Sequence, residues 1–212
     1  MTTFAPKTYQ QQVLDSIEAY FKACHELPSP SIAFTATTER LWGHGNAYNP
    51  LSGFPADMPY FCLRVPTGGG KTWLAAKSVT RAMDTSTTII VATRQAFQVE
   101  DEESRKVYQS SGALMHHFDN LSPTQRDGLL SEGEGAERTT PCSLANVLRL
   151  RRPLVVVDEA HNSRTELAFD MLARFRPSGV MELTATPDLE RTPSNVLHSV
   201  SAAELKAEKM IK

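Results

Sequence analysis

The sequence is poor in cysteine and has no long apolar run. Its three cysteines, Cys24, Cys62 and Cys142, are an odd number, stand far apart and form no C-x-x-C pair. This usage argues against a disulfide framework and suits a reducing cytosol. No stretch reaches the roughly 18 apolar residues of a membrane span, and the amino-terminal residues do not resemble a signal peptide. We therefore expect a cytoplasmic protein that makes no contact with a membrane.

The sequence also lacks an excess of positive charge. Its 22 basic and 24 acidic residues give a net charge of −2, whereas an autonomous nucleic-acid binder carries an overall basic field. The densest basic cluster, Arg149, Arg151 and Arg152, is interpreted as ordinary surface charge, and the acidic run 100–103 as a solvated helix face. Any binding of nucleic acid is therefore expected to be local and weak.

A glycine-rich turn between an apolar strand and a helix predicts a phosphate site. Residues 60–83 read YFCLRVPTGGGKTWLAAKSVTRAM, and the three glycines leave backbone N–H groups free to converge on phosphate oxygens. Lys71 would reach the β- and γ-phosphates, and the Thr72 hydroxyl would ligate a nucleotide-bound Mg²⁺. The strict P-loop pattern asks for glycine where this chain has Val65, so a chance glycine-rich turn is the alternative.

A second segment places two acids at the end of a buried strand. Residues 152–163 read RPLVVVDEAHNS, and the apolar run before the acids suits a strand that is buried on both faces. Ligands of an α/β sheet bind beyond the carboxyl ends of its strands, so Asp158 and Glu159 should arrive beside the phosphate loop. One carboxylate would hold magnesium and the other would orient or deprotonate the attacking water. A solvated acidic turn is the alternative interpretation.

A third apolar strand ends in hydroxyl side chains. Residues 180–187 read VMELTATP, and Thr184 and Thr186 would hydrogen-bond groups beside the γ-phosphate. By itself this pattern is equally typical of a Ser/Thr-rich turn. A near copy, FTATT at residues 34–38, lies in a region predicted to be a loop, and we assign it no function.

At these three segments the chain resembles the superfamily-two helicases and translocases. PTGGGKT is similar to their motif I, DEAH to motif II and TATP to motif III, in the family's order. The likeness is strongest to the ATPase subunits of type III restriction enzymes and covers most of residues 60–190. It implies a three-layer α/β RecA-like P-loop NTPase domain with a mostly parallel central sheet. It also implies that the protein binds ATP and Mg²⁺ and couples ATP hydrolysis to DNA translocation.

The resemblance implies a role for each motif residue. In the catalytic set, Glu159 is the general base, Lys71 binds phosphate, and His161 couples hydrolysis to movement. The metal ligands are Thr72 and Asp158. The nucleotide-binding set is Gln10, Thr67, Gly68, Gly69, Gly70, Lys71, Thr72, Thr184 and Thr186, of which the two late threonines also couple hydrolysis to movement.

Apolar residues at helical spacing predict a helix over residues 7–22 with one buried face. Many superfamily-two motors carry an aromatic–glutamine pair at the start of such a helix. Gln10 is therefore a candidate for reading the adenine edge, and Tyr9 for stacking on the base. For either residue, the alternative is a helix-start position in solvent. Residues 27–59, rich in Pro, Ser, Gly and Asn, predict a long loop.

The length of 212 residues suits one domain of this kind. We expect residues 1–59 to hold the first helix and loop, 60–200 the RecA-like domain, and 201–212 a capped helix leading to a second RecA-like domain that is absent. That domain would supply arginines to the γ-phosphate, so this chain alone should hydrolyse ATP slowly. It is an expected partner, together with DNA and with nuclease and modification subunits.

Two interpretations stay open at this point. Residues 88–98, TIIVATRQAFQ, fit either motif Ia or the later strand-loop before motif II. In the second case, residues 99–145 are an insertion with helices around 102–108 and 124–130 and a flexible segment over 131–138.

The function is either a hydrolysing motor or a non-hydrolysing nucleotide-binding or assembly module. A kinase-like P-loop transferase would not explain DEAH followed by TATP.

Overall fold

The computed structural model describes residues 5–83, 89–92, 107–133, 135–158, 166–190 and 193–212. The helices are α1 (Thr8–Glu26), α2 (Pro30–Trp42), α3 (Lys71–Met83), α4 (Pro123–Asp127), α5 (Leu144–Arg151), α6 (Glu166–Arg174) and α7 (Ala202–Ala207). The strands are β1 (Tyr60–Arg64), β2 (Ile89–Ala92), β3 (Leu154–Asp158), β4 (Gly179–Thr184) and β5 (Val196–Ser199). Among the described residues between β2 and β3 are two short 3₁₀ helices, η3 (Gly112–Phe118) and η4 (Gly135–Glu137).

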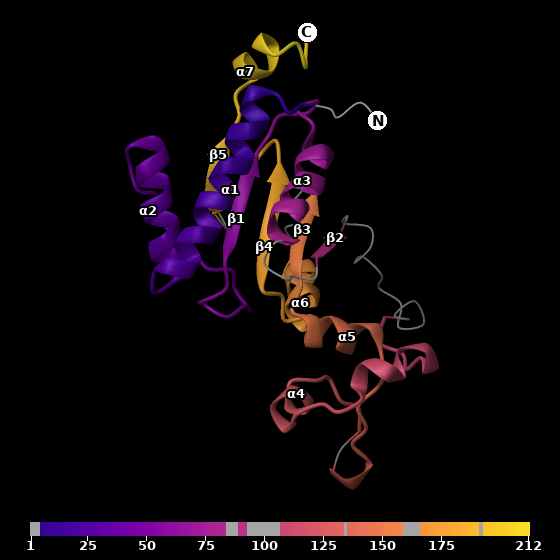
Figure 1. The fold of residues 1–212 in the computed structure, drawn as a ribbon. Coiled ribbons are helices and arrows are strands. Elements are labelled where there is room, and N and C mark those ends of the chain that lie inside the picture. The colour runs from indigo at the N-terminus through magenta and orange to yellow at the C-terminus, as the bar shows by residue number, and fades with distance from the viewer. Residues whose placement is uncertain (1–4, 84–88, 93–106, 134, 159–165, 191–192) are drawn as a thin grey trace.

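The sheet is parallel at every strand pair, in the order β2-β3-β4-β1-β5 (Figure 1). β4 therefore separates β1, which leads into the glycine turn, from β3, which ends at Asp158. The register pairs Leu63 with Leu183 and Leu183 with Asp158, so the carboxyl ends of these three strands share one edge. This arrangement confirms the expected α/β fold class with a parallel central sheet.

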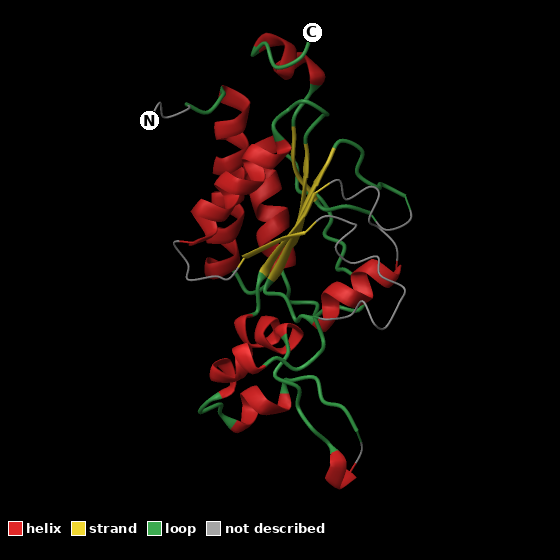
Figure 2. Cartoon of the chain, turned by 90° about the vertical axis from the view of Figure 1, so that its right-hand side faces the viewer, coloured by secondary structure: helices red, strands yellow, loops and turns green. Residues whose placement is uncertain are grey.

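Helices cover both faces of the sheet, which gives the expected three layers (Figure 2). Alternate residues of a strand point to opposite faces, so the sheet contributes to two apolar cores. Phe61, Leu63 and Met181 belong to the core that α1, α2 and α3 cover. Tyr60 and Val180 belong to the other core, which includes residues of α5 and α6. The buried face predicted for the first helix is confirmed in α1, which extends to Glu26.

The prediction of a long loop over residues 27–59 is wrong in part, because α2 lies within it. Ser29 caps α2 by accepting a hydrogen bond from a first-turn N–H, and Pro30 occupies a first-turn position where its missing N–H costs little. Gly43 ends the helix in the left-handed region with a φ of 76°. Ser, Pro and Gly mark helix ends here, and the FTATT copy at 34–38 lies inside the helix.

Residues 107–151 form a lobe beyond the amino ends of the strands (Figure 1). Asn146, fully buried, holds this lobe together because its Nδ2 donates to the carbonyl oxygens of Leu130 and Pro141, both at 2.9 Å. Its Oδ1 accepts from Leu130 N at 2.8 Å. The partly buried Arg149 donates to Gly128 O at 2.7 Å, so this arginine is a structural anchor and not the surface charge that we predicted.

The helices predicted within this lobe are partly confirmed. α4 begins one residue before the predicted range 124–130 and ends at Asp127. Most of the range 102–108 lies outside the described residues. The segment 131–138, predicted to be flexible, contains η4 and is closed by an antiparallel bridge between Glu132 and Thr139.

The predicted capped helix near the carboxyl end is confirmed as α7. Ser201 Oγ accepts from Glu204 N at 3.2 Å, and Ser201 N donates to Glu204 Oε2 at 2.7 Å, which is a complete capping box. Within the described part of the chain, no helix is both long enough and apolar enough to cross a membrane.

Candidate functional site

The turn between β1 and α3, residues 66–70, is called the glycine loop below. Gly68 and Gly70 have φ values of 82° and 73°, which favour glycine strongly. A Cβ on Gly69 would lie 2.6 Å from Val65 Cγ1 and 3.0 Å from Pro66 O, so that position has no room for a side chain. A side chain at any of these three positions would be strained or crowded, and the binding of phosphate by this loop stays a prediction.

Val65 departs from the strict P-loop pattern for a structural reason. Its side chain is fully buried in the core, and its N–H donates to Thr184 O at 2.8 Å. The residue therefore continues the pairing of β1 with β4 by one step beyond the strand. The glycine loop begins only after this position.

Lys71 and Thr72 form the start of α3, directly after the glycine loop. Thr72 and Thr67 are exposed, whereas Lys71 is 8% exposed. The positive end of the helix dipole makes the start of this 13-residue helix suitable for an anion. These features fit the phosphate groups of a nucleotide.

Asp158 is the last residue of β3 and is partly buried. It alternates with Val157, so it lies on the same side of the sheet as Val156, which packs in the core beneath α3. Through Leu183 the register sets Asp158 level with Leu63 of β1, two strand spacings or roughly 10 Å away, and the glycine loop begins three residues after Leu63. Glu159 and His161 lie outside the described residues.

The donor set at this edge fits magnesium. Asp158 offers carboxylate oxygens and Thr72 offers a hydroxyl, which are hard ligands of the kind Mg²⁺ takes. Among the described residues there is no group of three or more His, Cys, Asp and Glu side chains that would hold a metal by itself. Few protein ligands are expected for a cation that arrives with nucleotide phosphates.

Thr184 and Thr186 have different environments. Thr184 is fully buried at the end of β4, and its Oγ1 accepts from Thr186 N at 3.2 Å. This is the local turn that the sequence offered as the alternative interpretation. Thr186 is exposed. A contact of either hydroxyl with the γ-phosphate stays a prediction.

Tyr9 and Gln10 are buried beside the glycine loop. Both are 2% exposed, so neither is the solvent-facing helix start that was the alternative. Tyr9 donates its hydroxyl to Gly69 O at 2.9 Å, and burial raises the pKa of this phenol. Gln10 Oε1 accepts from Lys7 N at 2.9 Å, and its Nε2 lies 3.0 Å from the position of a Cβ on Gly70. The adenine role of Gln10 stays a prediction, whereas the buried Tyr9 ring presents no face to a base.

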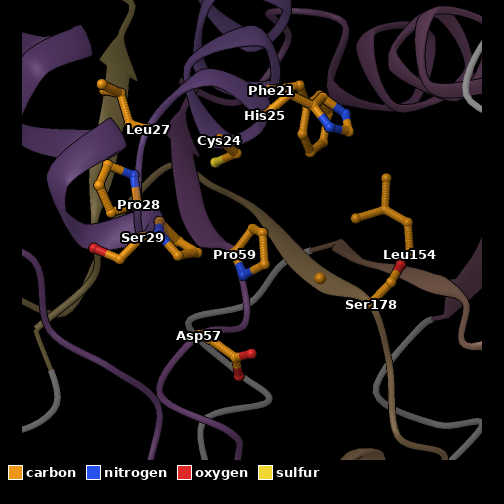
Figure 3. A pocket seen from close by; sticks show the side chains of 12 residues that line it. Phe21, Cys24, His25, Leu27, Pro28, Ser29, Asp57, Pro59, Leu154 and Ser178 are labelled. Carbon is orange, nitrogen blue, oxygen red and sulfur yellow. The ribbon is translucent and has the colours of Figure 1, made fainter.

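A cavity of about 420 Å³ lies at the opposite edge of the sheet (Figure 3). Pro59, Leu154 and Gly179, at or just before strand starts, line it together with Cys24 and other residues at the end of α1. Burial raises the pKa of the Cys24 thiol to about 11, so it is protonated at neutral pH and a poor nucleophile. This cavity is separate from the glycine loop.

Sequence reasoning missed the residues that reach the glycine loop from the carboxyl end. Leu205, Met210 and Ile211 lie against its glycines, although more than 130 residues separate them in the chain. Glu208 Oε1 accepts from Thr8 N at 3.1 Å and joins the same segment to the start of α1. Capping residues predicted helix α7, but no local sequence pattern indicated that α7 and the residues after it pack against the glycine loop.

Comparison with known families gives one match. A family model described as type III restriction enzyme, res subunit, matches residues 3–189. The match covers α1, the glycine loop, β3 and β4, and it ends before β5. No curated protein matches the chain.

Proposed function

Because the chain belongs to the family of type III restriction enzyme res subunits, we propose that it binds Mg-ATP at the glycine loop and hydrolyses it to drive translocation on DNA. The family implies an ATP-dependent motor domain of the helicase or translocase type. The observation that carries the proposal is the shared carboxyl edge of β1, β4 and β3. At this edge β1 leads into the glycine loop and Lys71, and β3 ends at Asp158, with β4 between the two strands.

Each residue of this edge has a chemical role in the proposal. The N–H groups of the glycine loop and the Lys71 ammonium bind the β- and γ-phosphates. Thr72 and Asp158 hold Mg²⁺, which neutralises phosphate charge when it is bound. Glu159, the next residue after β3, takes the proton of the attacking water. His161, Thr184 and Thr186 couple the state of the γ-phosphate to movement.

Fast ATP hydrolysis requires arginines in addition to the residues of this edge. Arginines that stabilise the transition-state charge contribute roughly 10³ to 10⁵ in rate in other phosphate-transferring proteins. We propose that a second RecA-like domain supplies them, and that nuclease and modification subunits join the assembly. The 212-residue chain alone should therefore turn over slowly, with little stimulation by DNA. The alternative is a nucleotide-binding or assembly module that does not hydrolyse ATP.

Titration of Lys71→Ala with Mg-ADP tests the nucleotide site. The variant should bind at least roughly tenfold more weakly, because one point charge on the phosphates is lost and α3 is retained. Lys77→Ala is the matched control, since Lys77 is an exposed lysine on the same helix and should leave affinity unchanged. Equal affinity in Lys71→Ala and the parent chain would remove the central claim.

A further inference from the structure

The end of the chain packs on the glycine loop. We call residues 205–211 the tail segment. A Cβ placed on Gly68 would lie 3.1 Å from Ile211 Cγ2, and one on Gly70 would lie 4.0 Å from Met210 Cε. A Cβ on Gly69 would lie 3.4 Å from Leu205 Cδ1. Side chains of the tail segment therefore pack against all three glycines, fully buried at Leu205 and partly buried at Met210 and Ile211.

A specific turn directs the tail segment to this place. Lys209 N donates to Lys206 O at 3.0 Å and Met210 N to Leu205 O at 2.9 Å, which is the hydrogen-bond pattern of a Schellman motif at the end of α7. Lys209 has a φ of 57° at the position that usually holds glycine. A non-glycine residue there persists when its surroundings hold it in place. The chain reverses at this point, and Met210 and Ile211 turn back toward the glycine loop.

The tail segment has the right surface for a nucleobase. A base needs an apolar contact surface beside the phosphate cradle. Met210 and Ile211 are partly buried apolar side chains, so some of their surface is open to solvent. Tyr9 and Gln10 also contact the glycine loop but are almost fully buried, so they offer a base very little exposed surface.

We propose that Met210 and Ile211 form an apolar wall against which the base of the bound nucleotide packs. The inference rests on the proposed nucleotide site and adds the residues that determine base affinity. The tail segment follows the part of the chain that matches the family, residues 3–189. The glycine loop and Lys71 bind the phosphates, whereas the tail segment contributes only to ligands that carry a base.

Two ligands separate the wall from the phosphate cradle. The 212-residue chain and the double variant Met210→Ala/Ile211→Ala are titrated with Mg-ADP and with Mg-pyrophosphate, which has no base. The double variant should bind ADP roughly tenfold more weakly, equivalent to about 1.4 kcal/mol of contact, and pyrophosphate within about twofold of the parent. Ile32→Ala/Met115→Ala is the matched control, because it removes the same side chains from exposed positions away from the loop. Its ADP affinity should be unchanged.

A conservative variant guards against misfolding. Met210→Leu/Ile211→Val keeps an apolar surface and should restore ADP affinity to within about twofold of the parent. Equal weakening of ADP and pyrophosphate in the alanine variant would overturn the proposal, because the tail segment would then only support the loop. Tighter ADP binding would also overturn it, since the tail segment would then be a lid. If the parent bound neither ligand, the nucleotide site itself would fail.

Discussion

The two edges of the sheet differ in what they offer a ligand. The carboxyl edge has the glycine loop, a helix start, Lys71 and Asp158, and it is where strand ends meet. The amino edge has a cavity of about 420 Å³, but its lining is mostly apolar and includes the protonated thiol of Cys24. A helix start and charged side chains are what phosphate binding requires, so the chemistry of the lining is a better guide to the proposed site than empty volume.

The largest expected effect separates the two acids at the carboxyl edge. Asp158→Asn should weaken Mg-ADP binding roughly tenfold, because a charged ligand of the metal is lost. Glu159→Gln should keep binding and lower ATP turnover by roughly 10² or more, because the base is removed and the metal ligand stays. Calorimetry and a phosphate-release assay check the two results. Equal loss of binding in both variants would show that the roles are not divided.

A pair of glycine substitutions compares the edges directly. In Gly69→Ala the new Cβ meets the buried Val65 at 2.6 Å, so we expect up to about 3 kcal/mol lower unfolding free energy and loss of ADP binding. In Gly179→Ala, at the amino edge, the Cβ meets Leu154 and Pro59 at 3.2 Å. That variant should be destabilised without losing ADP affinity. Urea unfolding and ADP titration test the two variants. Equal ADP affinity in both variants would show that the two edges do not differ in nucleotide binding.

The smallest expected effect is the pH dependence of stability that His198 of β5 causes. His198 is buried on β5, with its Nδ1 2.8 Å from Ser16 Oγ, and burial lowers its pKa from 6.5 to about 4. Between pH 6.5 and pH 4 the imidazole is protonated in the unfolded chain but stays neutral in the folded chain. The contribution of His198 to the unfolding free energy is therefore complete above pH 6.5 and is lost as the pH falls toward 4. We expect about 2 kcal/mol of loss between pH 7 and pH 5.

His198→Asn isolates this contribution from that of other acid-sensitive groups. Asparagine can still bond to Ser16 but does not titrate, so the variant's unfolding free energy should change less between pH 7 and pH 5 than that of the parent. Urea unfolding at both pH values measures the difference. The same pH dependence in both proteins would show that the burial of His198 does not cause the loss of stability at low pH.

The sequence predicted the carboxyl edge of the sheet better than the rest of the molecule. Three motifs in order indicated the parallel sheet, the glycine loop and the position of Asp158, because each motif depends on a local pattern of strand, turn and charge. The loop predicted over 27–59 failed because Ser29, Pro30 and Gly43 are as typical of helix ends as of loops. Arg149 was misjudged because its carbonyl partners, Gly128 O and Arg174 O, are distant in sequence.

By itself the sequence determined the family, the glycine turn between a strand and a helix, and the capped helix α7, since these depend on composition and spacing over a few residues. Only the tertiary structure decided the strand order, the burial of Tyr9 and Gln10 beside the glycine loop, and the packing of Met210 and Ile211 against it. Such contacts join segments that are more than 130 residues apart. Side-chain packing between them depends on the whole sheet, which no local pattern encodes.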